Sequence, residues 1–244
     1  DNYSNSTEDT YRRINEITGK RNRLAWFKVN LCNKEELMDT LKQANSIKDI
    51  IHFAAFQSVP ESVPAPLLYY HNNMESLVSI LCLCREKKIR NFIFSSSCSV
   101  YGNINTLPVT EKVELLEAES PYAHTKQMGE EVVKSFTKYT PEFKSVLLRY
   151  FNPAGAHPSA KIGELPLGPP TSLVPVITRT AAGLIPKMYV HGSDYETRDG
   201  SCIRDYIHVS DIADAHIKAL DFVLKGKNLE ACSLFNLGTG NGIT

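Results

Sequence analysis

The sequence predicts an α/β fold in which helices cover both faces of a parallel, doubly wound sheet. Along the 244 residues, apolar runs rich in β-forming side chains alternate with amphipathic helical stretches, an order typical of βαβ units. One run, Phe92-Ile93-Phe94, is apolar on both sides of the strand it would form, as a sheet buried on both faces requires. A hydrophobic content of 42% is enough for a substantial core.

The individual elements follow from the same pattern. We predict strands at Ala25–Val29, Ile50–Phe53, Asn91–Ser95, Ser145–Tyr150 and Ser233–Asn236. We predict helices between them at Lys34–Ala44, Leu67–Lys88, Tyr122–Tyr139 and Ser210–Leu224. The second of these helices repeats apolar side chains at helical spacing and ends in basic residues, which complement the helix dipole.

The character of the chain changes after Phe151. The segment Asn152–Pro170 is rich in Pro and Gly and is long for a passive connection, so we expect a binding loop. A helix at Leu173–Leu184, a strand at Met188–His191 and a polar loop at Gly192–Arg204 are predicted next. The predicted domains are therefore a first sheet-containing domain at 1–151, a small substrate lobe at 152–204 and a return to the first sheet at 205–244.

Charge and cysteine content limit the function classes. The formal net charge is zero and the pI is about 7.2, so no global basic field is present to hold nucleic acid or an anionic membrane. The six cysteines have no metal-ligand spacing, which favours reduced thiols and no metal site. No secretory leader or bilayer-spanning apolar run is visible. We expect a cytoplasmic protein.

The strongest chemical signal is the segment Ser120-Pro121-Tyr122-Ala123-His124-Thr125-Lys126. On a helix, Tyr122 and Lys126 are four residues apart and share one face. An ammonium group beside a phenol lowers the phenol pKa, which suits proton transfer near neutral pH. In isolation, a solvated helix with the same spacing is the better interpretation.

Two strand ends and one further segment strengthen that signal. The run Asn91–Ser95 continues into a hydroxyl cluster that ends with Ser99, and ligands of open α/β sheets bind at the carboxyl ends of strands. A serine-rich turn is the plain alternative. The segment Arg149–Pro153 opens into the Pro/Gly loop, and Arg204 begins the run Arg-Asp-Tyr-Ile-His-Val. An arginine can grip a diphosphate with two hydrogen bonds, although a surface ion pair between Arg204 and Asp205 is equally compatible with this run alone.

Taken in collinear order, these segments resemble the extended short-chain dehydrogenases that act on nucleotide sugars, and most closely the UDP-glucose 4-epimerases. The resemblance runs from Asp1 to Gly240 and includes Ile51–Ala55 and Asn152–Pro158. It implies a Rossmann-like sheet, incomplete at its N-terminus, with a smaller substrate lobe. The glycine-rich fingerprint of the family would precede Asp1, and a final lobe segment would follow Thr244. We therefore expect the chain as given to be inactive alone, and a longer form to be a homodimer.

The resemblance also implies an activity and its residues. It implies interconversion of UDP-glucose and UDP-galactose through a 4-keto sugar, with tightly bound NAD. Tyr122 would be the base, Ser97 would bond the same sugar oxygen, and Lys126 would hold the nicotinamide ribose. The implied cofactor-binding residues are Asp1, Asn2, Tyr3, Ser4, Asn5, Asn30, Leu31, Phe53, Ala54, Ala55, Gln57, Asn73, Ser95, Lys126 and Tyr150. The implied residues for the UDP-sugar are Ser97, Cys98, Ser99, Tyr122, Tyr150, Phe151, Asn152, Thr171, Ser172, Leu173, Tyr189, Val190, His191 and Arg204.

Some positions depart from the family pattern, and they leave alternatives open. Gln57 stands where the family usually has Lys, Ser172 replaces Asn, His191 replaces an aromatic residue, and Cys98 replaces Ala. A UDP-N-acetylhexosamine 4-epimerase and another nucleotide-sugar enzyme are the alternatives within the family. A dehydratase would need acidic groups in place of Ser97-Cys98-Ser99. A catalytically silent scaffold of the same fold is the alternative from another class.

Overall fold

The computed structural model describes residues 1–19, 24–42, 44, 47–104, 106–228 and 230–244. Two compact units make up the chain, and each is described by itself. The first unit consists of Asp1–Asn2, Val29–Phe151 and Ala213–Leu237. The second unit consists of Tyr3–Lys28, Asn152–Ile212 and Gly238–Thr244. The change of unit after Phe151 falls where the first domain was predicted to end. Residues 3–28, 205–212 and 238–244, which were predicted to belong with the first sheet, group with the second unit.

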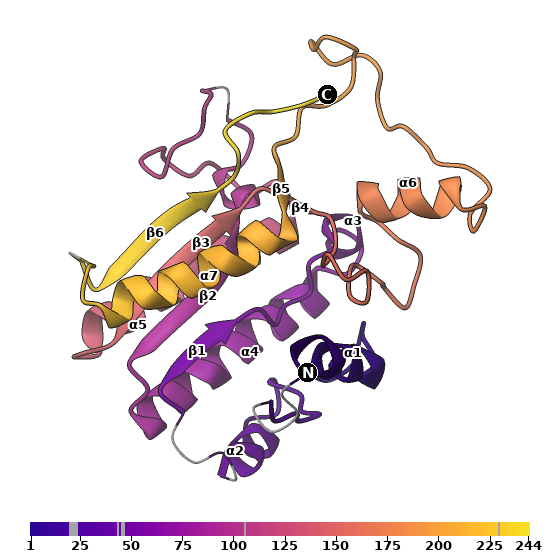
Figure 1. The fold of residues 1–244 in the computed structure, drawn as a ribbon. Helices are drawn as coiled ribbons and strands as arrows, with labels where there is room; N and C mark the ends of the chain where they lie inside the picture. Colours follow the sequence, from indigo (N-terminus) through magenta and orange to yellow (C-terminus); the bar gives the residue numbers. More distant parts are fainter. Residues whose placement is uncertain (20–23, 43, 45–46, 105, 229) are drawn as a thin grey trace. The chain divides into compact units, whose positions relative to one another are not determined.

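The chain alternates between helices and strands (Figure 1). The strands are β1 (Asp49–His52), β2 (Asn91–Ser97), β3 (Lys144–Tyr150), β4 (Asn152–Ala154), β5 (Tyr206–His208) and β6 (Cys232–Leu237). The helices are α1 (Glu8–Thr18), α2 (Lys34–Lys42), α3 (Val59–Ser62), α4 (Pro66–Lys87), α5 (Pro121–Tyr139), α6 (Leu173–Ala181) and α7 (Val209–Leu224), with a short 3-10 helix, η2 (Cys98–Tyr101).

A parallel sheet with strand order β1-β2-β3-β6 is the centre of the first unit. Four of the predicted strands are confirmed as these four, and the helices predicted between them are confirmed as α2, α4, α5 and α7. Register places Ser96 directly beside Arg149 and Ser97 beside Tyr150. Polar side chains from two different strands therefore meet at the carboxyl end of the sheet.

Helices cover both faces of this sheet, as a doubly wound fold requires. Phe92 and Phe94 belong to a core cluster that includes buried side chains of α4 and α5, while Ile93 packs with Ala219 and Val223 of α7 on the other face. Figure 1 shows α7 on one side of the strands and α4 and α5 on the other. Alternate residues of β2 thus enter two separate cores, and each fully buried Phe or Ile contributes about 1.5–3 kcal/mol.

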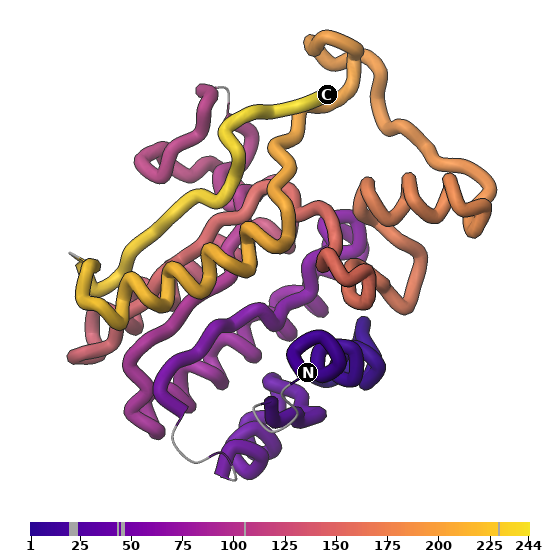
Figure 2. Tube along the Cα trace, viewed as in Figure 1, coloured from indigo at the N-terminus to yellow at the C-terminus, as the bar shows by residue number. Residues whose placement is uncertain are grey.

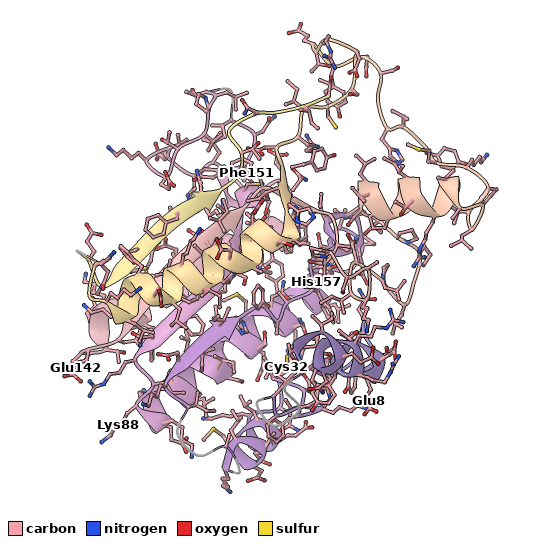
Figure 3. The ribbon with its side chains drawn as sticks, viewed as in Figure 1. Glu8, Cys32, Lys88, Glu142, Phe151 and His157 are labelled. Carbon is pink, nitrogen blue, oxygen red and sulfur yellow. The ribbon has the colours of Figure 1, made fainter. Side chains whose placement is uncertain are left out.

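All four strands present their carboxyl ends at the same edge of the sheet, because they are parallel. Figure 2 traces the backbone of these four strands, which pair in parallel. In Figure 3, Phe151 lies just past β3 at that edge, whereas Lys88 and Glu142 lie at the opposite edge, before β2 and β3 begin. The hydroxyl groups of β2 and the loop after β1 therefore share one end of the unit, where open α/β sheets bind ligands.

The second unit has less regular structure. Its strands β4 and β5 form a two-stranded parallel sheet, and α1 and α6 lie before and after the Pro/Gly-rich segment in the chain. Helix α1 was not predicted, since the start of the chain reads as a polar loop. It is stabilised by ion pairs at helical spacing, from Arg12 to Asp9 and Glu16, and it ends at Gly19 in the left-handed conformation.

Two predicted strands are wrong. The segment Ala25–Val29 forms no strand: Val29 N donates to Asp1 O at 3.0 Å, and no ladder follows from that bond among the described residues. The aromatic ring of Trp26 instead stacks with Tyr11, 5.0 Å between centroids. The segment Met188–His191 is also irregular, and its side chains are largely exposed. Conversely, β4 lies in a segment that was expected to be a loop, and β5 was not predicted. None of the described helices is long and apolar enough to cross a membrane.

Candidate functional site at the carboxyl end of the first sheet

The end of β2 presents three successive serines, and the pleat separates them. Ser97 caps η2, where its Oγ accepts hydrogen bonds from Ser99 N at 3.2 Å and Ser99 Oγ at 2.9 Å. Ser96 is turned toward α5 and donates to Glu130 Oε1 at 2.6 Å. Ser95 Oγ is buried and has no hydrogen-bond partner of acceptable geometry within the described residues. Such an orphaned hydroxyl at a sheet end is suited to a ligand, because leaving it unbonded costs free energy.

Helix α5 starts beside this strand end. Ser120 is its N-cap, and its Oγ accepts from Ala123 N at 3.2 Å. Pro121 follows at the first helical position, where its missing N–H is harmless. These two residues fix the first turn, so that Tyr122 lies in it and Lys126 follows one turn later on the same face.

Tyr122 lies within reach of Ser97. Burial raises the pKa of the Tyr122 phenol above its ordinary value of 10.0, and a side-chain hydrogen bond with Ser97 acts in the opposite direction. The structure therefore brings together the predicted base and the predicted serine, which come from an α5 helix turn and a β2 strand end. With Lys126 in place the pKa of the phenol is still raised, so the lowering expected from the ammonium is not seen, and a positive charge in addition to Lys126 is needed to favour the phenolate.

Lys126 is the buried cation beneath this pair. Its Nζ donates to Ser95 O at 2.7 Å and lies 5.2 Å from the Phe94 ring centre and 5.9 Å from the Tyr122 ring centre. Burial lowers the pKa of Lys126 from 10.5 to about 8, while the Glu130 carboxylate acts to raise it. The ammonium carries three donors and bonds one described acceptor, so donors remain for a ligand.

The loop after β1 lies at the same sheet edge. Asn73 of α4 holds it: Asn73 Oδ1 accepts from Phe56 N at 2.7 Å, and Asn73 Nδ2 donates to Phe56 O at 3.1 Å and to Thr125 Oγ1 at 3.0 Å. Both amide hydrogens of this predicted cofactor-binding residue are thus used within the protein. Its contribution is to position the loop, in which Phe53, Ala54 and Gln57 are exposed and Ala55 is half-buried.

Tyr150 ends β3 beside the serines, and its hydroxyl shares a 2.9 Å hydrogen bond with His216 Nε2. Burial raises the pKa of Tyr150, and the nearby Ser95 hydroxyl acts the other way. The ring of Phe53 lies 4.5 Å from the His216 ring. His216 of α7 is therefore a site residue that the sequence analysis missed. A histidine facing the core in an otherwise apolar helix stripe was the available signal.

A network of hydrogen bonds fixes the segment between η2 and α5. Asn236 of β6 receives the Tyr101 hydroxyl on its Oδ1 at 2.6 Å, and its Nδ2 donates to Val109 O at 3.3 Å. Its backbone N donates to Glu111 Oε1 at 2.7 Å. Gln127 Nε2 donates to Leu116 O at 2.8 Å. The segment that joins Ser97 to Tyr122 is therefore held at several points, and Asn236 is a second residue that sequence analysis missed.

The predicted adenosine-side residues are divided between the units. Asp1 and Asn2 belong to the first unit, as do Asn30 and Leu31. The Asn30 side chain accepts from Cys32 N at 3.1 Å, and Leu31 packs on the core of that unit. Tyr3, Ser4 and Asn5 belong to the second unit.

The second unit also carries most predicted residues for the nucleotide of the substrate. Asn152 starts β4, and its backbone N donates to Asp205 O at 2.8 Å. Arg204 is exposed and donates from Nη1 to Ile203 O at 2.7 Å. The Asp205 carboxylate instead accepts from Thr239 and Gly240, so no ion pair joins Arg204 to Asp205 in the described chain. Of the remainder, Ser172 caps α6 and is half-buried, and the exposed members are Thr171, Leu173, Tyr189, Val190 and His191.

Three further predicted substrate residues lie in the first unit. Cys98 and Ser99 form the start of η2, and Phe151 donates from its backbone N to Leu237 O at 3.0 Å. No group of three or more metal-ligating side chains gathers among the residues that the structure describes. Serine hydroxyls, a phenol, an ammonium and an imidazole are therefore the functional groups of this site.

Comparison with known proteins places the chain in a family. Residues 4–238 match the model of the NAD dependent epimerase/dehydratase family. The chain is 44% identical over 243 residues to a UDP-glucose 4-epimerase of Bacillus subtilis (strain 168). The matched region covers 99% of this chain and 69% of that protein. It is 40% identical over 242 residues to a UDP-glucose 4-epimerase of Dictyostelium discoideum, with 99% and 69% coverage.

Solved structures give the same result. A UDP-glucose 4-epimerase from Bifidobacterium longum in complex with NAD+ and UDP superposes with a TM-score of 0.93 at 37% identity, covering 100% of this chain and 71% of that one. A UDP-Glc/GlcNAc 4-epimerase from Campylobacter jejuni superposes with a TM-score of 0.80 at 33% identity, with 100% and 71% coverage. The Rossmann-like α/β fold predicted from the sequence is confirmed.

Proposed function

We propose that the chain, which belongs to the NAD dependent epimerase/dehydratase family, carries the catalytic groups of an NAD-dependent UDP-glucose 4-epimerase, the enzyme that interconverts UDP-glucose and UDP-galactose. One observation carries the proposal. Tyr122 is hydrogen-bonded to Ser97 and lies one helical turn from the buried ammonium of Lys126. A phenol, a hydroxyl and a cation at one sheet edge are suited to moving a proton on and off a sugar hydroxyl.

Each protein group has a distinct task in this reaction. Tyr122 Oη takes the proton of the sugar 4-hydroxyl and later returns it, and Ser97 Oγ bonds the same sugar oxygen. Lys126 keeps a positive charge beneath the site, which favours the phenolate form of Tyr122. Ser95, Lys126 and Tyr150 would hold the nicotinamide end of NAD, which would supply the hydride acceptor and donor for sugar C4. Uptake and return of one proton at Tyr122 Oη would balance the removal and return of that hydride.

The residues of the first unit fit the nicotinamide end of NAD. Ser95 Oγ is a buried hydroxyl that makes no hydrogen bond of good geometry within the described chain, although the Tyr150 hydroxyl lies near it, and Lys126 Nζ has donors left for ribose hydroxyls. Tyr150 is held by His216, and the exposed ring of Phe53 offers an apolar surface. Asp1 is proposed to bind the adenosine ribose, because a carboxylate there favours NAD over NADP.

The proposal for the UDP group rests on the second unit. Arg204 is exposed and is not paired with the Asp205 carboxylate, so its guanidinium is available for a diphosphate. Asn152, Thr171, Ser172, Leu173, Tyr189, Val190 and His191 are proposed to complete the nucleotide site. The Campylobacter jejuni relative is named for both UDP-Glc and GlcNAc, so UDP-N-acetylglucosamine is the second substrate to test.

Location and assembly complete the proposal. Free cysteines at Cys32, Cys82, Cys84, Cys98, Cys202 and Cys232 support a cytoplasmic protein, because reduced thiols persist in the cytoplasm.

Leu67, Leu68 and Val78 of α4 are exposed, and exposed apolar side chains of this kind support a homodimer. Sedimentation analysis that found a monomer at working concentration would contradict the dimer.

The test of the function is Tyr122→Phe in the NAD-loaded protein. Removing the hydroxyl deletes the proton acceptor while keeping the ring, so we expect UDP-galactose turnover to fall about a hundred- to ten-thousand-fold. UDP binding, measured by calorimetry, should change little. Tyr139→Phe is the matched control, since Tyr139 lies at the far end of the same helix and is 75% exposed. Normal turnover by Tyr122→Phe would refute the mechanism, and an inactive parent with intact NAD would favour a silent scaffold.

A further inference from the structure

A carboxylate without an assigned role lies one helical turn beyond Lys126. Glu130 is fully buried between α5 and the sheet. Its Oε1 accepts hydrogen bonds from Ser96 Oγ at 2.6 Å and from Arg149 Nε at 2.8 Å, and its Oε2 accepts from Arg149 Nη2 at 2.6 Å. Buried carboxylates are rare unless they are paired, so this arrangement has a specific structural or functional cause.

The contacts of Glu130 tie α5 to two strands at one level of the sheet. Ser96 of β2 and Arg149 of β3 are directly opposite in the strand register, and the carboxylate bonds both. The residue before Ser96 is Ser95, whose carbonyl accepts from Lys126 Nζ at 2.7 Å. Lys126 and Glu130 therefore bond adjacent residues of the same strand from adjacent turns of the same helix. Any slide of α5 along β2 would break both contacts together.

The arginine of this pair is itself fixed. Its guanidinium lies 4.6 Å from the Tyr101 ring centre, and the Tyr101 hydroxyl donates to Asn236 Oδ1 at 2.6 Å. A planar guanidinium with two parallel bonds to a carboxylate restricts the rotation of both side chains. The network thus connects α5, β2, β3, η2 and β6 at the edge that holds the site.

We propose that Glu130, held by Ser96 and Arg149, is a positioning residue for Lys126. It sets the register of α5 on β2 so that Nζ reaches the Ser95 carbonyl, and its negative charge keeps the buried ammonium protonated. The inference rests on the proposed role of Lys126 in the epimerase reaction. Glu130 itself touches neither the sugar nor the cofactor in this role.

The charges around Lys126 support this assignment. Glu130 is the acidic group that raises the pKa of Lys126 against the larger effect of burial. His52 of β1 also faces Lys126, and both burial and the ammonium lower its pKa, so it stays neutral. The other groups on the surrounding elements are the Ser95 carbonyl, the Phe94 ring, the phenols of Tyr122 and Tyr150, the amide of Asn73 and the paired guanidinium of Arg149.

The test is the titration of Lys126 in Glu130→Gln, followed by the ¹⁵Nζ resonance, with Lys126→Arg to assign it. Loss of the negative charge should move the midpoint down by about one pH unit. A purely structural role predicts the opposite sign, because a loosened helix would hydrate the ammonium and move its pKa up toward 10.5. The alkaline limb of the epimerase pH profile should follow the same shift.

Two controls complete the experiment. Glu131→Gln removes the neighbouring carboxylate, which is 71% exposed and shares Lys134 with Glu130: Lys134 Nζ lies 2.9 Å from Glu131 Oε1 and 3.6 Å from Glu130 Oε2. This variant should leave the midpoint unchanged. The double change Glu130→Gln with Arg149→Met avoids an unpaired buried arginine and should also lower the midpoint, by less. An unchanged or higher midpoint in either folded Glu130 variant would overturn the inference. A lowered midpoint in a protein without epimerase activity would refute the proposed function alone, since the resonance does not depend on turnover.

Discussion

The buried ammonium of Lys126 should make the site costly in stability, and Lys126→Met should reveal how costly. Lys126 is 6% exposed, and burial lowers its pKa to about 8 from 10.5. Methionine has a similar length and flexibility but no charge to desolvate. We therefore expect Lys126→Met to abolish turnover and yet to gain stability relative to the parent near neutral pH.

The magnitude follows from proton binding in the two states. The unfolded chain keeps its lysine protonated up to pH 10.5, whereas the folded protein releases the proton near pH 8. Between these values the unfolded state binds more protons, so the stability of the parent rises with pH. At about 1.4 kcal/mol per pH unit, the buried lysine costs about 3 kcal/mol at pH 7, where it is ionised, and about 1 kcal/mol at pH 9.5, where it is neutral.

The assay is urea unfolding of the cofactor-free parent and Lys126→Met at both pH values. The difference in unfolding free energy between the two proteins should shift by about 2 kcal/mol in favour of the parent as pH rises from 7 to 9.5. The lost bond to Ser95 O shifts both measurements equally and cancels. Parallel stability curves would refute the reasoning, since they would mean that Lys126 titrates alike in the folded and unfolded chain.

Two other predictions concern the surroundings of Lys126. Burial lowers the pKa of His52 to about 3 from 6.5. Below pH 6.5 the unfolded chain therefore binds more protons than the folded one. The free energy of unfolding of the parent should fall by about 2 kcal/mol between pH 7 and pH 5 because of this group. His52→Phe, which keeps the stacking with Phe92 and Phe94, should lack that loss in urea unfolding, and equal acid sensitivity would contradict it. A Cβ on Gly129 would lie 2.8 Å from Phe94 Cζ. Gly129→Ala should therefore destabilise the folded protein by up to about 2 kcal/mol, although alanine has the better helix propensity. A more stable variant would show that the Phe94 ring moves aside at little cost.

The strands and long helices of the first unit could be predicted because their signal is local. Phe92, Ile93 and Phe94 show both faces of a buried strand in three residues, and the structure places them in two cores. Tyr122 and Lys126 also have a local signal, since one helical turn separates them, but it was the resemblance to a family, and not this spacing alone, that made them the predicted catalytic residues. The strand prediction was wrong where an apolar run was not paired with a neighbouring strand. Ala25–Val29 is as apolar as a strand, yet it has no neighbouring strand in the described structure to pair with.

Helix α1 shows the opposite error. Most of its side chains are polar and none is buried, so its few apolar residues, Tyr11, Ile14 and Ile17, gave only a weak hydrophobic signal. Ion pairs of Arg12 and Arg13 with Asp9 and a glycine C-cap stabilise it instead. The charges at positions 9, 12, 13 and 16 have helical spacing and could have indicated the helix. For α1, the spacing of the charged residues was a better sequence signal for a helix than the spacing of the apolar ones.

The residues missed at the site are those whose partners are distant in sequence. His216 bonds Tyr150 across 66 residues, Asn236 bonds Tyr101 across 135, and Arg149 bonds Glu130 across 19. One local signal did exist for Glu130: it lies eight residues after Tyr122 and four after Lys126, on the face that enters the protein. A helix that buries three polar side chains in succession must bond each of them. The polar stripe of α5 therefore predicts acceptors and donors on the sheet beside it, and the serines of β2 with Arg149 of β3 supply them.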